Sequence, residues 1–200
     1  MRLRRLHRLL SLVLGAFILA HLFNHGALFF GVEAHLAVQE YLRKFYRHPL
    51  VEPVLIASFL VQMLAGLRLL WAKGWPKRFW GRLQVVSGGL LGAFLIQHIS
   101  AALLTRLFKP EIDTNVFWAG AVVSRIEFSW YFAPYYFLGV TALFAHIAAV
   151  MVIRRNLVLG VSFLGAGSVF AWLLVMALMG FFYPVELPPA YEAYLDDFWF

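Results

Sequence analysis

The sequence predicts an all-α integral membrane protein with five transmembrane helices, a cytoplasmic N-terminus and an outer C-terminus. Three observations carry this prediction: composition, the length of the apolar runs, and the distribution of basic residues. Of 200 residues, 62% are hydrophobic and 14% are charged, and the mean hydropathy is +0.78. Soluble domains carry about 25% charged residues, so this composition indicates a chain that lies in lipid.

Five charge-poor runs are long enough to cross a bilayer core, which takes roughly 20 helical residues. They cover residues 9–30, 54–71, 83–104, 131–153 and 159–182. The first run is too long for the core of a cleaved signal peptide, so we expect it to be a retained anchor. We divide the chain into a five-helix domain, residues 1–182, and an acidic, aromatic tail, residues 183–200.

The charges fix the expected orientation. Ten of the 17 Lys and Arg residues lie before the first run, between the second and third or after the fourth. Arg68 lies close by, which makes eleven, and no acid accompanies them. All ten acids lie on the other side. The positive-inside rule therefore places the N-terminus in the cytoplasm and the tail outside. Because the basic residues lie between apolar runs, they form no solvated stripe for nucleic acid.

The loops predict little further structure. Residues 33–46 alternate apolar and charged residues at helical spacing, which favours a short interfacial helix. Residues 108–130 are predicted to be an aromatic-rich loop at the other outer boundary. The chain has no cysteine, which excludes disulfides and iron–sulfur clusters ligated by this chain and leaves histidine as the strong soft-metal ligand. No motif of a hydrolase or an ATPase is present.

The histidines divide by predicted depth. Counted from the cytoplasmic boundary at about 1.5 Å per residue, His21 lies near 18 Å and His98 near 22 Å. His146 lies near 10 Å and Gln62 near 14 Å, which defines an inner layer. The remaining histidines at the membrane edge are expected to be solvated or interfacial; they are His7, His35 and His48.

Two imidazoles at one depth are what bis-histidine haem b requires, and nearby small residues leave space for a flat ring. These small residues are Gly15, Ala16, Gly88, Gly89, Gly92 and Ala93. Three other interpretations stay open at this point: buried hydrogen-bonded histidines, a proton path, and a small-metal site on His21 and His25, which are four residues apart. His25 is also placed to bond water or a porphyrin propionate at the outer interface.

Four segments together resemble the cytochrome b membrane-anchor subunit of succinate dehydrogenase and fumarate reductase, in its five-helix, single-polypeptide form. They are RRLHRLLSL followed by His21, LQVVSG at 83–88 with His98 ten residues further, YYFLGVTALFAH ending in His146, and QMLAGLRLLWAK starting at Gln62. The resemblance covers residues 4–155. It departs from the family at Gln62, which stands where the family has a histidine ligand.

The resemblance implies a quinone-reactive anchor that passes electrons between an iron–sulfur subunit and membrane quinone. The iron–sulfur and flavoprotein subunits would dock on the cytoplasmic side of a bacterial or archaeal cell membrane, and the flavoprotein would carry the dicarboxylate chemistry. The quinone would be menaquinone or ubiquinone. The resemblance implies one haem b with His21 and His98 as axial ligands. In the inner layer we expect a hydrogen bond between Gln62 and His146, with a second haem on His146 as the alternative.

The quinone site is predicted near the cytoplasmic boundary, where a hydroxyl and cations would bind the quinone oxygens. The candidates are Ser87, Arg68 and Arg82. Alternatively, Glu33 or Glu52 would take protons from a quinol on the outer side. Two competing functions are a histidine-lined transporter or proton conduit and a haem-free structural anchor.

Overall fold

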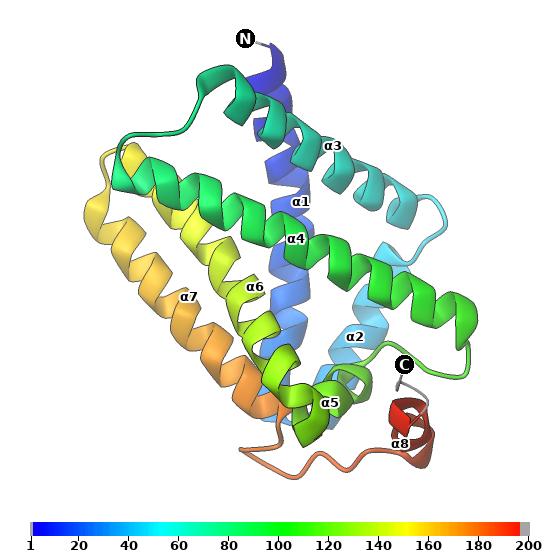
Figure 1. Cartoon of the computed structure of the whole chain (residues 1–200). Helices are drawn as coiled ribbons and strands as arrows, with labels where there is room; N and C mark the ends of the chain where they lie inside the picture. The colour runs from blue at the N-terminus through cyan, green and yellow to red at the C-terminus, as the bar shows by residue number, and fades with distance from the viewer. Residues whose placement is uncertain (1, 197–200) are drawn as a thin grey trace. The chain divides into compact units, whose positions relative to one another are not determined.

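The computed structural model describes residues 2–196, which form helices and no strand. In chain order the elements are α1 Arg2–Ala27, the 3₁₀ turn η1 Leu28–Phe30, α2 Val32–Tyr46, α3 Val51–Lys73, α4 Phe79–Phe108, α5 Val116–Ser124, α6 Ile126–Ile153, α7 Leu157–Leu178 and α8 Pro189–Asp196 (Figure 1). Within these residues α1 with η1, α3, α4, α6 and α7 are long and apolar enough to cross a membrane. The prediction of an all-helical chain with five helices of spanning length is confirmed.

The helix ends differ from the predicted runs because apolar residues also occupy the turns. The fifth run was predicted to extend to residue 182, but α7 ends at Leu178. Gly180 has a φ of +75°, and the Phe181 N–H donates to the Met176 carbonyl at 3.0 Å. A glycine in the left-handed region followed by such a bond is a common helix stop, and hydropathy does not register it.

Clustering of contacts divides the chain into two units, residues 1–82 and 83–200, which we describe separately. In the first unit α1 packs on α3 and, through η1, on α2. Gly31 joins η1 to α2 with a φ of +124°, a value that disfavours any side chain. The short helix predicted over residues 33–46 is present as α2, and Leu28 is fully buried at this corner.

In the second unit α6 and α7 form an antiparallel hairpin (Figure 1). Residues 154–156 make the whole connection, with Arg155 at a φ of +72°. Asn156 caps α7 by accepting a hydrogen bond from the Leu159 N–H at 3.1 Å. A Cβ built on Gly167 would lie 2.0 Å from the Phe144 ring, so this glycine allows the two helices to pack closely.

Within the same unit α4 meets α6 through side chains. The Phe94 ring lies over Gly139, where an added Cβ would be 2.1 Å from it. The Tyr135 hydroxyl donates to the Phe94 carbonyl at 3.1 Å. α6 also contains Pro134, which cannot donate to the preceding turn of the helix.

The predicted loop over residues 108–130 contains a helix that the sequence interpretation missed. α5 begins after Asn115, whose side chain accepts a hydrogen bond from the Phe117 N–H at 2.9 Å, and six of its nine residues are buried. α8, from the predicted tail, packs on α5, and the Tyr191 hydroxyl donates at 3.0 Å to the carbonyl of Asp113, which lies just before α5. Residues 197–200 of the tail lie outside the described residues.

Candidate functional site

The second unit brings together two of the segments that carry the family resemblance. Nδ1 of His146, on α6, donates to the backbone carbonyl of Gln84, on α4, at 2.9 Å. Because Nδ1 carries the proton, Nε2 of the neutral ring holds the lone pair. This is the arrangement in which a metal-ligating histidine is fixed by a backbone acceptor.

Gly88 makes room for the same ring. A Cβ built on Gly88 would lie 3.0 Å from both Cε1 and Nδ1 of His146, whereas one on the neighbouring Gly89 would meet nothing within 4 Å. The glycine of LQVVSG therefore determines how closely His146 approaches α4. A Cβ built on Gly15 of α1, another of the predicted small residues, would also meet nothing within 4 Å.

His98 lies ten residues beyond Gly88 on α4, which is nearly three helical turns, and is surrounded by aromatic rings. The Phe94 ring stacks on it with centroids 5.4 Å apart, and the Tyr136 ring meets it edge-on at 6.3 Å. The neighbouring Gln97 accepts a hydrogen bond at its Oε1 from the Tyr131 hydroxyl at 2.8 Å. His98 is thus held in a defined orientation within an aromatic setting.

In the first unit His21 and His25 contact each other. Their Nε2 atoms are 3.2 Å apart, so one nitrogen donates and the other accepts. The rings are nearly perpendicular, with centroids 4.6 Å apart. His21 belongs to this unit and His98 to the other, so their pairing as axial ligands stays a prediction.

His35 was predicted to be solvated or interfacial, and this is wrong: its side chain is 1% exposed. Its Nδ1 donates to the backbone carbonyl of Asn24 at 2.9 Å. That carbonyl lies in the last turn of α1, where helical acceptors lack intrahelical donors. Burial lowers the pKa of His35 to about 4, the Asn24 carbonyl opposes this, and the Arg43 cation adds to the lowering.

The corner between α1 and α2 contains two further buried polar atoms. Nε2 of His35 and Oδ1 of Asn24 have no hydrogen-bond partner among residues 2–196, and Asn24 is 2% exposed. The His25 and His35 rings approach with centroids 5.6 Å apart. The sequence held one signal for this corner, because His35, Gln39 and Arg43 recur every four residues and so share one face of α2.

Gln62 has His7 as its partner in the first unit. The amide Nε2 donates to His7 Nδ1 at 3.4 Å, and a Cβ on Gly66 would lie 3.5 Å from His7 Nε2. His7 is half-buried rather than solvated, because α1 is already helical from Arg2 and carries His7 onto α3. The predicted hydrogen bond between Gln62 and His146 would link residues of different units, so it stays a prediction.

The predicted quinone residues differ in setting. Ser87 is buried, and its hydroxyl donates to the Leu83 carbonyl of its own helix. Arg68 and Arg82 belong to the first unit and are exposed, and Arg82 donates to the Pro76 carbonyl at 3.2 Å. The alternative proton acceptors, Glu33 and Glu52, each lie in the first turn of a helix, α2 and α3.

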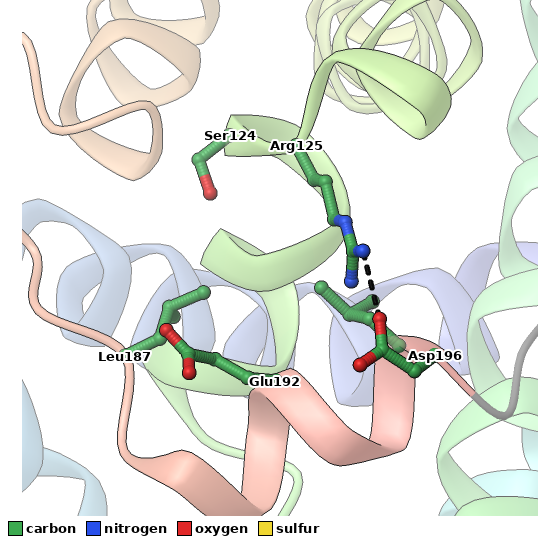
Figure 2. Close-up of a pocket in the computed structure, with 6 residues that line it drawn as sticks. Ser124, Arg125, Leu187, Glu192 and Asp196 are labelled. Carbon is green, nitrogen blue, oxygen red and sulfur yellow. Dashed lines mark ion pairs between the residues drawn. The ribbon is translucent and has the colours of Figure 1, made fainter.

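A cavity of about 400 Å³ lies between α5 and α8, away from the histidines of this unit. Its lining carries both charges: Arg125 pairs with Asp196 at 2.7 Å, and Glu192 also lines the cavity, with its carboxylate on the side of Leu187 (Figure 2). The cation is neutralised by its neighbours, so this cavity has no single-sign charge with which to attract an ionic ligand.

Among residues 2–196 no three His, Cys, Asp or Glu side chains converge as the ligands of a bare metal ion do. Axial ligation of haem needs only two nitrogens, one for each face, and His146 has the fixed tautomer that such a ligand requires. Comparisons with protein-family models, curated proteins and solved structures find no match for this chain.

Proposed function

We propose that this chain is the membrane-anchor cytochrome b subunit of a succinate dehydrogenase or fumarate reductase complex. It would pass electrons between an iron–sulfur subunit, docked with a flavoprotein subunit on the cytoplasmic side, and membrane quinone. The proposal places the chain in a bacterial or archaeal cell membrane as a multi-pass protein. The dicarboxylate chemistry would take place in the flavoprotein.

One observation supports this function best: the contact of His146 with the segment LQVVSG. These two stretches are 58 residues apart in sequence, measured from Gly88 to His146. Both belong to the resemblance, and they meet through a hydrogen bond and through the space that Gly88 leaves. A backbone acceptor for Nδ1 orients the ring and keeps Nε2 available as a ligand nitrogen.

The chain's own residues would hold haem b through His21 and His98, and through His146 if a second haem is present. Haem b, when bound, supplies a one-electron carrier inside the membrane. Phe94 and Tyr136 fix the orientation of the His98 ring. The apolar helices exclude water, and the basic residues of the cytoplasmic loops would attract an acidic partner surface.

The test is the reduced-minus-oxidised absorption spectrum of the purified chain. We expect the sharp α band of low-spin bis-histidine haem in the wild type and its loss in His98→Ala. A wild-type chain without this band, expressed with an adequate haem supply, would contradict the proposal. A band unchanged in His98→Ala would contradict the assignment of His98.

The haem-to-protein ratio then tests whether the inner layer, at Gln62 and His146, holds a second haem. We expect one haem per chain, and a second haem after Gln62→His, which restores the histidine that the family has at this position. A ratio near two in the wild type, with half of the band lost in His146→Ala, would instead assign a second haem to His146. If His146 holds a second haem, Gly88→Val should reduce the content of that haem, because its side chain would crowd the His146 ring. Gly89→Val is the matched control, since a Cβ there meets nothing within 4 Å.

A second candidate, a proton conduit, is favoured by the hydrogen bond between His21 and His25, since linked imidazoles can transfer protons. It is distinguished by the same spectrum, in which a conduit without haem has no α band.

A further inference from the structure

α1 presents two imidazole nitrogens at one place. His21 and His25 are one turn apart on the same face, and their Nε2 atoms converge to 3.2 Å. Bonds between metal ions and imidazole nitrogen are about 2.0–2.1 Å long, so an iron held by either nitrogen lies within about 5 Å of the other. Both nitrogens therefore address the same small region beside α1.

Both rings are also suited chemically. In the hydrogen bond between them one Nε2 carries the proton and the other offers its lone pair. In His146 and His35, by contrast, the tautomer is fixed, because each Nδ1 donates to a backbone carbonyl. The hydrogen bond is satisfied with either ring as the acceptor, so either imidazole can be the tautomer that offers a lone pair at Nε2.

Each imidazole has its own support. The Phe17 ring stacks on His21 with centroids 5.7 Å apart and an interplanar angle of 20°. The His35 ring lies beside His25 at 5.6 Å, and His35 is itself fixed to the Asn24 carbonyl. Loss of one imidazole thus leaves the support of the other in place.

From this convergence we propose that His25 is a second iron ligand on α1 that can replace His21, so that either histidine holds the haem from this helix. The inference rests on the proposed function, because it concerns the same haem. It changes the expected consequence of losing His21: the iron is retained by His25.

The experiment compares His21→Ala, His25→Ala and the double variant, with His98→Ala as the reference for complete loss of a ligand. Haem-to-protein ratio and the low-spin α band are measured on the purified full-length chain. We expect each single variant to keep at least about half of the band and the double variant to lose at least about nine tenths of it. The band of His21→Ala should also shift in position or reduction potential, since the ligand has changed.

Loss of the band in His21→Ala alone, with His25→Ala unaffected, would overturn the inference while leaving the proposed function intact. Retention of the band in the double variant would overturn it as well. A wild-type chain without the band overturns the proposed function and the inference together. His21→Gln and His25→Gln, with circular dichroism of every variant, separate ligand loss from failure to fold.

Discussion

The α6–α7 hairpin and the corner between α1 and α2 both contain buried residues, but different forces hold them together. In the hairpin, glycines receive aromatic rings, as Gly167 receives Phe144. In the corner, buried polar groups lie near the buried Leu28: His35 Nδ1 donates to the Asn24 backbone carbonyl, and the His25 ring lies beside that of His35. The two regions are therefore sensitive to different changes. Added side-chain volume should destabilise the hairpin, whereas a change of charge should destabilise the corner.

The largest predicted loss of stability follows from adding a side chain in the close-packed hairpin. Gly167→Leu should lower the free energy of unfolding by about 3 kcal/mol or more, because even its Cβ would overlap the Phe144 ring. Unfolding in detergent micelles, followed by circular dichroism, measures the change. Gly165→Leu is the matched control on the same helix, since a Cβ there meets nothing within 4 Å. Equal destabilisation by the two substitutions would show that close packing does not hold the hairpin together.

The buried His35 in the corner predicts a free energy of unfolding that depends on pH. The pKa of His35 is lowered from 6.5 to about 4 in the folded chain, so the unfolded chain binds the proton more readily. Its contribution to stability is complete above about pH 7 and is lost as the pH falls from 6.5 towards 4. Between pH 7.5 and 4.5 this amounts to about 2.5 kcal/mol.

The measurement is the difference in unfolding free energy between those two pH values, for the wild type and for His35→Gln. In His35→Gln the difference in unfolding free energy between the two pH values should be smaller by the contribution of His35. Gly165→Leu, which changes no titratable group, should keep it. A wild-type difference that persists unchanged in His35→Gln would assign the pH dependence to other groups.

An ion pair outside the corner predicts the smallest effect. Arg125 pairs with Asp196 at 2.7 Å, where both side chains are partly exposed to solvent. Solvent screening limits such pairs to about 0.2–1 kcal/mol. A double-mutant cycle of Arg125→Ala and Asp196→Ala should give a coupling energy in this range that declines with added salt. A coupling above that range would show that α8 screens the pair from water.

The five long helices were predictable because about 20 apolar residues in a row have few other ways to satisfy their backbone in lipid. α5 was not, because nine residues are too few to give a hydropathy signal and its helix depends on the Asn115 cap and on packing. The burial of His35 was also missed, since a residue outside the apolar runs was assumed to face water. The contact between His146 and Gln84 uses a backbone carbonyl, which no residue type in the sequence reveals.

The three-residue turn at residues 154–156 bears on the order in which the tertiary contacts form during folding. Two long helices joined so closely meet without closing a long loop, so their contacts cost little chain entropy. α1 and α3 are separated by residues 28–50, and their contact must wait for that longer closure. We therefore expect the α6–α7 hairpin to be the first tertiary structure to form during refolding, and α4 to dock on it later through Phe94 and the His146 hydrogen bond.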